Sequence, residues 1–251
     1  MPHTENILPG GRYAVVSCHV ERPLDDEVWA RFSELQERRP GGFRIAALMR
    51  PPDSQANEDE ILWLGRAKAA AQHGPLGLHT HWTAPDHARP TGGDPAARVR
   101  EQAAWLRDRG LQVSLFCGGG WYVDAPVAEA LAELGYTDCT ATAFRPRYLD
   151  DGAPRLGASE PCYVRLPSGR SVLEIPTTHS IGMLARGLLA PYRPSVVHAY
   201  FHDTDLLDAV RRTALAVGLT FLGAKRWQTD LEQLQRGLRP AKTMSFANNA
   251  P

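Results

Sequence analysis

Residues 13–49 read YAVVSCHVERPLDDEVWARFSELQERRPGGFRIAALM. The first part, Tyr13–Cys18, is a short apolar run of the kind that forms a buried β-strand. It is followed by Asp25–Arg38, where apolar residues recur at helical spacing, and by a second apolar run at Arg44–Met49. A strand, a helix and a second strand in this order predict a βαβ unit with parallel strands.

The same alternation continues along the rest of the chain. We expect further helices at Asn57–His73 (with Asn57 as its N-cap), Pro95–Arg109, Ala125–Leu134, Gly182–Leu189, Asp203–Val217 and Thr229–Arg236. We expect further strands at Leu76–His79, Gln112–Phe116, Tyr136–Ala141, Val172–Ile175, Val196–Phe201 and Leu219–Leu222. No G-x-G-x-x-G fingerprint follows the first strand, so a dinucleotide-binding fold is disfavoured. The predicted fold class is α/β, a distorted (β/α) barrel of about seven parallel strands with helices outside.

The length of 251 residues suits a single domain, because barrels of this type commonly need about 200–250 residues. We expect one domain over residues 1–251, with its core at 13–236. Residues 144–171 are rich in proline, glycine and arginine, and are expected to form an insertion that holds a hairpin. The tail, residues 238–251, is expected to be loosely held.

Composition narrows the classes of partner. Lys+Arg and Asp+Glu both number 28, so no basic field favours nucleic acid. No apolar run reaches the roughly 18 residues of a membrane span, and residues 1–11 lack the pattern of a secretory signal. The cysteines lie too far apart for a C-x-x-C clip and are expected to be free thiols in a reducing compartment: Cys18, Cys117, Cys139 and Cys162. We expect a cytoplasmic protein with a small-molecule substrate and no nucleic-acid or membrane partner; the oligomeric state stays open.

Histidines gather where the predicted strands end. Five of them lie at or just beyond the carboxyl ends of strands: His19, His79, His81, His179 and His202. In parallel β/α folds, that edge is where catalytic and ligand-binding groups collect. The pattern therefore predicts an active site at one end of the barrel.

Two pairs at this edge have the spacing of metal ligands. His19 and Glu21 are two residues apart, as are His79 and His81, so each pair points to one side of an extended chain. We predict a metal site formed by Glu21, His79 and His81, with Zn²⁺ as the default and Fe²⁺, Co²⁺, Ni²⁺ or Mn²⁺ as alternatives. Asp86 of the following loop, with its neighbour His87, is a spare candidate ligand. The competing interpretation is that the paired histidines are loop residues bonded to the backbone.

Other residues near the strand ends have less specific patterns. His202 ends a strand and is placed to act as a general acid, while Asp203 and Asp205 suit capping of the helix that follows. His179 is either a substrate contact or a polar group at the start of a loop. The aromatic residues beyond strand ends are either core residues or a stacking wall for a sugar-like ring: Trp82, Trp121 and Tyr122.

Several short motifs, in this order, resemble the polysaccharide deacetylase superfamily, which has the NodB-homology fold. The resemblance covers about residues 13–222. The motifs are Cys18-His19-Val20-Glu21, His79-Thr80-His81-Trp82, Phe116-Cys117-Gly118-Gly119-Gly120-Trp121-Tyr122, Glu133-Leu134-Gly135-Tyr136 and Ala199-Tyr200-Phe201-His202. The resemblance implies a distorted (β/α) barrel and metal-dependent hydrolysis of N-acetyl groups.

The resemblance also implies roles for individual residues. His19 occupies the position of the family's aspartate base, and Glu21 that of its acidic metal ligand. The two histidines of the second motif are two residues apart here, where four is usual. Cys117 stands where the family has an arginine that accompanies the aspartate base, so a neutral histidine has replaced an anion together with its cationic partner. The backbone N–H groups of Gly120–Tyr122 are candidates for holding an oxyanion.

These patterns predict a metal-dependent hydrolase that removes an N-acetyl group from a soluble sugar or related small molecule, as in natural-product biosynthesis. His19 would accept the proton of water and His202 would protonate the leaving amine. Another amide hydrolase on the same fold is the first alternative. A catalytically silent sugar-binding relative is the second, because both the base and the arginine are changed.

Overall fold

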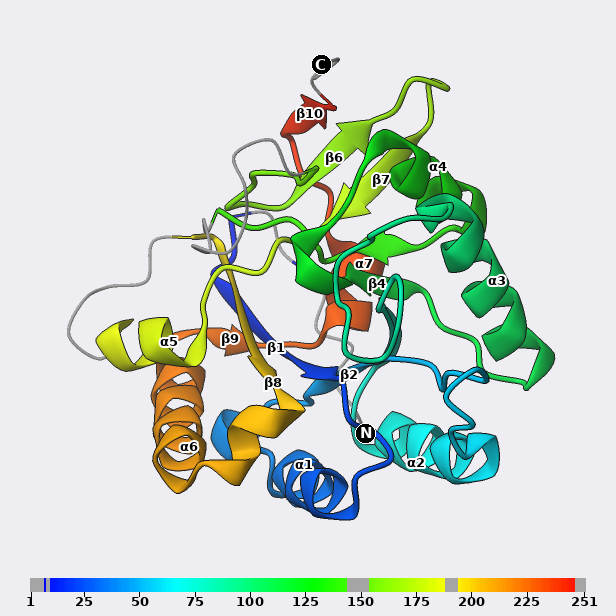
Figure 1. Ribbon diagram of the computed structural model, residues 1–251. Helices are drawn as coiled ribbons and strands as arrows, with labels where there is room; N and C mark the ends of the chain where they lie inside the picture. Colours follow the sequence, from blue (N-terminus) through cyan, green and yellow to red (C-terminus); the bar gives the residue numbers. More distant parts are fainter. Residues whose placement is uncertain (1–6, 8–9, 144–153, 188–193, 247–251) are drawn as a thin grey trace.

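The computed structural model describes residues 7, 10–143, 154–187 and 194–246 (Figure 1). Its strands are β1 (Tyr13–Val20), β2 (Ala46–Met49), β3 (Leu76–Thr80), β4 (Leu115–Gly118), β5 (Thr137–Asp138), β6 (Cys162–Arg165), β7 (Ser171–Glu174), β8 (Val196–His202), β9 (Trp227–Gln228) and β10 (Thr243–Ser245). Its α-helices are α1 (Asp26–Arg38), α2 (Glu60–His73), α3 (Pro95–Asp108), α4 (Ala125–Leu134), α5 (Ile181–Gly187), α6 (Ala209–Lys225) and α7 (Leu231–Gly237).

The central strands form a ring. Parallel pairing runs in the order β8-β1-β2-β3-β4-β5-β7. The chain beyond β7 closes the gap, because Thr177 N–H donates to the carbonyl of Ala141 while Thr178 N–H donates to the carbonyl of His198 in β8. This confirms the predicted fold class, a distorted (β/α) barrel of about seven parallel strands with helices around it.

Helices α1 to α6 surround the strands, and α7 lies near the middle of the view in Figure 1. Leu231 and Leu234 of α7 join the same buried cluster as Tyr13 and Val15, from the first half of β1. This end of the barrel is therefore filled by apolar side chains, which leaves the opposite, carboxyl end for polar groups. No helix in the described ranges is long and apolar enough to cross a membrane.

Strand alternation decides which side chains enter the barrel. In β1, Ala14, Val16 and Cys18 belong to the apolar cluster shared with the helices, whereas Tyr13 and Val15 belong to the inner cluster. Because side chains alternate along a strand, the odd-numbered series that begins at Tyr13 turns inward and carries His19 toward the barrel mouth. The same alternation governs β3, β4 and β8.

Two sequence predictions about helix boundaries are wrong. Leu219–Leu222 was predicted as a strand, but it lies within α6, where Leu215, Leu219 and Leu222 form one buried helical face. A short apolar run fits a strand and a helix face equally well, so the run alone could not decide. The N-cap of α2 is Asp59, whose side chain accepts from Leu62 N–H at 2.9 Å, and not Asn57.

Several other segments differ from their predicted ranges. The predicted helix Asp203–Val217 begins as a 3₁₀ turn over Asp203–Leu207, before α6. Of the hairpin expected within residues 144–171, β6 lies in that range and pairs antiparallel with β7, which covers most of the predicted strand Val172–Ile175; residues 144–153 lie outside the described residues. Residues 188–189 of the predicted helix Gly182–Leu189 also lie outside them. In the tail that we expected to be loosely held, β10 pairs with β6.

A buried pair of acids joins β5 to β7. Asp138 and Glu174 are partners in the strand register, and both are almost fully buried. Oδ1 of Asp138 accepts from Thr140 N–H at 2.9 Å, and Oε1 of Glu174 accepts from Ala141 N–H at 3.2 Å. Burial, reinforced by the neighbouring Asp138, raises the pKa of Glu174 well above its ordinary value. Burial raises the pKa of Asp138 as well, and Glu174 is the member whose neutral form the fold favours more strongly.

Replacing Glu174 with glutamine is expected to make the protein more stable than the wild type at neutral pH. A carboxyl whose folded-state pKa is raised stabilises the fold fully below its unfolded pKa of about 4.3, and that contribution is lost as the pH rises through the folded pKa. Glutamine keeps the neutral form at every pH. Urea unfolding of both proteins at acidic and at neutral pH measures the difference. Parallel changes in the two free energies of unfolding would show that Glu174 is not held neutral.

Candidate metal centre

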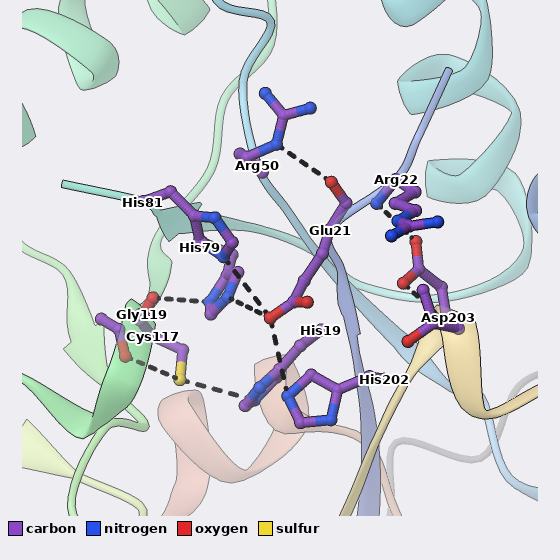
Figure 2. Close-up of polar contacts among 12 residues, drawn as sticks. His19, Glu21, Arg22, Arg50, His79, His81, Cys117, Gly119, His202 and Asp203 are labelled. Atoms are coloured by element: carbon purple, nitrogen blue, oxygen red, sulfur yellow. Dashed lines mark hydrogen bonds and ion pairs between the residues drawn. The ribbon is translucent and has the colours of Figure 1, made fainter. Parts of the chain in front are cut away.

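Three histidine rings converge on one carboxylate at the carboxyl end of the barrel (Figure 2). Oε1 of Glu21 lies 3.7 Å from Nε2 of His79 and 3.4 Å from Nε2 of His81. It also lies 3.6 Å from Nε2 of His202. Glu21 follows β1, His79 and His81 lie in and just after β3, and His202 ends β8. The structure thus brings together the predicted ligands and the predicted general acid.

Backbone carbonyls fix the tautomers of the two paired histidines. Nδ1 of His79 lies 2.9 Å from the carbonyl oxygen of Cys117, and Nδ1 of His81 lies 2.6 Å from that of Pro85. A carbonyl oxygen only accepts, so each Nδ1 carries the proton. Both Nε2 atoms are buried and have no hydrogen-bond partner. Burial lowers the pKa of His79 to about 4, so its ring is neutral and turns a bare Nε2 lone pair toward Glu21.

This arrangement fits a divalent metal. The two nitrogen lone pairs and the carboxylate repel one another unless a cation lies between them. In addition, metal-binding histidines usually donate a hydrogen bond from their other ring nitrogen to a carbonyl or carboxylate, as Nδ1 does here. Metal–nitrogen and metal–oxygen bonds of about 2.0–2.2 Å place tetrahedral ligands about 3.4 Å apart. The distances from Glu21 to His79 and His81 are close to this value. Glu21, His79 and His81 are therefore a group that could hold a metal ion.

The charge state of Glu21 also suits the binding of a divalent metal. Burial alone would raise its pKa, but the positive charge of the nearby His202 outweighs burial and holds the pKa far below its ordinary value. Glu21 is therefore an anionic ligand at neutral pH. The donor set of one carboxylate and two imidazoles suits Zn²⁺ and also Fe²⁺, Co²⁺, Ni²⁺ and Mn²⁺.

Two residues that the sequence analysis did not single out for this purpose hold the backbone of Glu21. Nε of Arg50 donates to the carbonyl oxygen of Glu21 at 3.0 Å, and the same guanidinium binds both carboxylate oxygens of Glu58 at 2.7 Å. Oδ2 of Asp203 accepts from Arg22 N–H at 2.8 Å, on the other side (Figure 2). Burial raises the pKa of Asp203 to about 6. The sequence feature that could have indicated Arg50 is its position directly after an apolar strand.

His202 is oriented by its own turn. Oδ2 of Asp205 accepts from the backbone N–H of His202 at 2.9 Å and lies 3.7 Å from Nδ1 of its ring. Asp205 therefore caps the turn, as expected, and also faces the imidazole. Burial would lower the pKa of His202, but the carboxylates of Asp205 and Glu21 outweigh burial and raise it.

His19 lies deeper in the barrel than the carboxylate. Its ring stacks on that of His79 with 4.7 Å between centroids, and its Nε2 lies 3.5 Å from Sγ of Cys117. The motif order predicted that Cys117 occupies the place of a partner to His19, and the structure puts the two side chains in contact. Burial, followed by the charge of His202, lowers the pKa of His19 well below its ordinary value, so the ring is neutral.

Two cavities open beside Glu21. One, of about 360 Å³, is lined by His19, His79 and His202 together with Gly120, Trp121 and Arg89, among others. The second, of about 430 Å³, is lined by His81, Arg22, Arg50 and Pro85, among others. Both include Glu21, Asp86 and Ala88. The convergent histidines and the carboxylate thus border open space large enough for a small molecule.

Trp121 has an unusual backbone conformation beside the first cavity. Its φ is 61°, a region that a bulky side chain rarely adopts, and it follows Gly120, whose φ is also 61°. The indole ring meets His19 edge-on at 5.8 Å and Tyr200 at 5.0 Å between centroids. Strained conformations of this kind gather at functional sites, and here the strain holds an aromatic wall against His19.

Three of the predicted substrate contacts line neither cavity. Trp82 is buried, and its Nε1–H donates to the carbonyl of Gly119 at 3.0 Å. The hydroxyl of Tyr122 donates to Asp124 at 2.6 Å. Nδ1 of His179 bonds with the hydroxyl of Thr178 at 2.8 Å.

The remaining candidates lie near the rim. The backbone N–H of Tyr122 donates to the carbonyl of Gly119, so it is already engaged and does not suit an oxyanion. The spare ligands Asp86 and His87 form an exposed ion pair with each other at 2.7 Å, at the edge of the first cavity.

No family model matches the sequence of this chain, and no curated protein is significantly similar to it. Solved structures do match. A 4-alpha-glucanotransferase from Thermococcus litoralis has a TM-score of 0.59 and 12% identity, over 94% of this chain and 42% of that enzyme. This chain thus spans less than half of the glucanotransferase.

Two further structures match over nearly their whole length. A protein from Mycobacterium smegmatis, described as a polysaccharide deacetylase, has a TM-score of 0.66 and 13% identity over 97% of this chain and 96% of its own. One from Bordetella bronchiseptica, described as a polysaccharide deacetylase involved in O-antigen biosynthesis, has a TM-score of 0.50 and 12% identity over 86% and 91%. The ring of parallel strands, with its polar groups at the carboxyl end, is therefore a polysaccharide deacetylase-like fold.

Proposed function

We propose that this protein is a metal-dependent hydrolase that removes an N-acetyl group from a soluble sugar or a related small molecule. One observation carries the proposal. The Nε2 atoms of His79 and His81 are buried, have no hydrogen-bond partner and face the carboxylate of Glu21. Because no proton lies between these two nitrogens and the carboxylate, the three groups suit a metal ion. The polysaccharide deacetylase-like fold supports the same reaction class.

The residues around the ligands supply the proton transfers. Glu21, His79 and His81 would hold a divalent metal, which would supply Lewis-acid activation of water and of the acyl carbonyl. The neutral ring of His19 accepts the proton of the attacking water. His202, held by Asp205 on the other side of Glu21, donates a proton to the leaving amine. Two histidines in different environments thus serve as base and acid.

The cavities indicate a small substrate. Trp121 presents an aromatic wall beside His19, which suits the apolar face of a sugar ring. Glu21 lines both cavities, so a substrate amide placed beside it would have its acyl group in one cavity and its amine portion in the other. A cytoplasmic small molecule is the substrate class that we propose, and natural-product biosynthesis is a suitable setting.

Acetate release from a panel of N-acetylated amino sugars tests the proposal. The purified protein should release acetate, lose this activity after chelation, and regain it when Zn²⁺, Co²⁺ or Mn²⁺ is added back. Metal analysis of the purified protein should find close to one divalent ion per chain. Release from non-sugar amides alone would favour a different amide hydrolase. Sugar binding without turnover or metal would favour a silent binding protein and contradict the proposal.

A further inference from the structure

A second set of ligand atoms lies deeper in the barrel than the first. His19, His79 and Cys117 each offer a buried ligand atom, and these atoms all lie within 4.8 Å of one another. We call these three residues the inner triad, and we call Glu21, His79 and His81 the outer triad. We propose that the inner triad binds a thiophilic cation such as Zn²⁺ or Cd²⁺, with Cys117 as a thiolate ligand.

The geometry of the inner triad fits a tetrahedral ion. Metal–nitrogen bonds of about 2.0–2.1 Å and metal–sulfur bonds of about 2.3 Å place the two ligand atoms about 3.5 Å apart. Nε2 of His19 lies 3.5 Å from Sγ of Cys117. The third ligand atom, Nε2 of His79, is buried and without a hydrogen-bond partner, because Nδ1 of that ring is bonded to the carbonyl of Cys117.

The chemistry of the inner triad differs from that of the outer triad. Two imidazoles and a thiolate are softer ligands than a carboxylate with two imidazoles, so the inner triad prefers Zn²⁺ and Cd²⁺ over Mn²⁺ and Mg²⁺. Burial, together with the nearby Asp138, raises the pKa of the Cys117 thiol. Binding forms a metal–sulfur bond, and the thiol proton leaves to solvent.

The two triads exclude each other. His79 belongs to both, and its single unprotonated nitrogen can bind only one ion at a time. An ion in the inner triad is also bound by Nε2 of His19. A thiophilic cation there would therefore take both the shared ligand and the proposed base away from the reaction.

Cadmium binding to the wild-type protein and to single variants tests the inner triad without any substrate. A cadmium–thiolate bond gives an ultraviolet charge-transfer band, which carboxylate and imidazole ligands do not give. We expect this band in the wild type or, where cadmium prefers the outer triad, in the His81→Ala variant. Cys117→Ser and His19→Ala should each lose the band. Cys139→Ser is the matched control and should keep it, because Cys139 is a buried free thiol of the same inner cluster.

Near-ultraviolet circular dichroism shows which variants are folded. His19→Ala leaves Cys117 intact, so loss of the band in that variant reports ligation even if Cys117→Ser does not fold. Absence of the band from both the wild type and His81→Ala would overturn the inner triad. Persistence of the band in Cys117→Ser, or its loss in Cys139→Ser, would overturn it as well. If neither the wild type nor His81→Ala shows the band but the wild type still releases acetate, the proposed function stands and only this inference is lost.

Discussion

Replacing His79 with alanine is expected to remove the bound divalent metal and to abolish acetate release. Its Nε2 is buried, has no hydrogen-bond partner and lies 3.7 Å from the carboxylate of Glu21, so a metal between them loses one of its three protein ligands. His81→Ala should also abolish acetate release, because its Nε2 lies 3.4 Å from the same oxygen, and any thiophilic ion that this variant keeps would lie in the inner triad. Metal analysis of the dialysed proteins and an acetate assay measure the two losses.

A histidine elsewhere on the surface provides the control. His73, in the last turn of α2, lines neither cavity beside Glu21, so His73→Ala should keep both metal and activity. Full metal occupancy in both His79→Ala and His81→Ala would refute the ligand assignment. Asp86 and His87, at the edge of the cavity, would then be the next residues to replace.

Replacing His202 with alanine is expected to lower the turnover number by about 10²–10⁴-fold while the metal stays bound, because this is the usual contribution of a general acid. The ring is placed by Asp205 and faces Glu21 at 3.6 Å. Steady-state kinetics and metal analysis of the same preparation separate the two quantities. A substrate with a better leaving group should recover much of the lost rate, since it needs less help from an acid.

Two results would contradict this role. Loss of the metal in His202→Ala would make His202 a ligand, which its 3.6 Å distance from Glu21 permits geometrically. An unchanged turnover number would assign leaving-group protonation to another residue. His179 would be the next candidate, although the structure bonds it to Thr178, away from both cavities.

The grouping of Glu21 with His79 and His81 was predictable because it depends on local periodicity. Residues two apart in an extended chain share a side, and the carboxyl ends of parallel strands meet at one end of a barrel. The contact between His19 and Cys117 was predictable only from the order of motifs, since the two lie on different strands. Their distance of 3.5 Å agrees with that order.

The placement of the aromatic side chains near the strand ends could not be predicted from the sequence. Three aromatic residues follow strand ends, and the sequence does not distinguish which of them would contact a substrate: Trp82, Trp121 and Tyr122. In the structure both indole rings are buried, but Trp121 lines a cavity, whereas Nε1–H of Trp82 donates to the carbonyl of Gly119. The difference comes from the positive φ angles of Gly120 and Trp121, which no periodicity encodes. The prediction of a strand at Leu219–Leu222 is wrong for a related reason, because a short apolar run does not define its own secondary structure.

The alternation of apolar runs and helical spacing was enough to predict a barrel and the edge at which its polar residues gather, because both follow from the local geometry of strands and helices. Only the tertiary structure decided the state of the ligands. The carbonyls of Cys117 and Pro85 fix the protons of His79 and His81, and Arg50 holds Glu21 from β2's end. These contacts join residues from different strands and loops, and a proton position depends on the partner that the fold supplies.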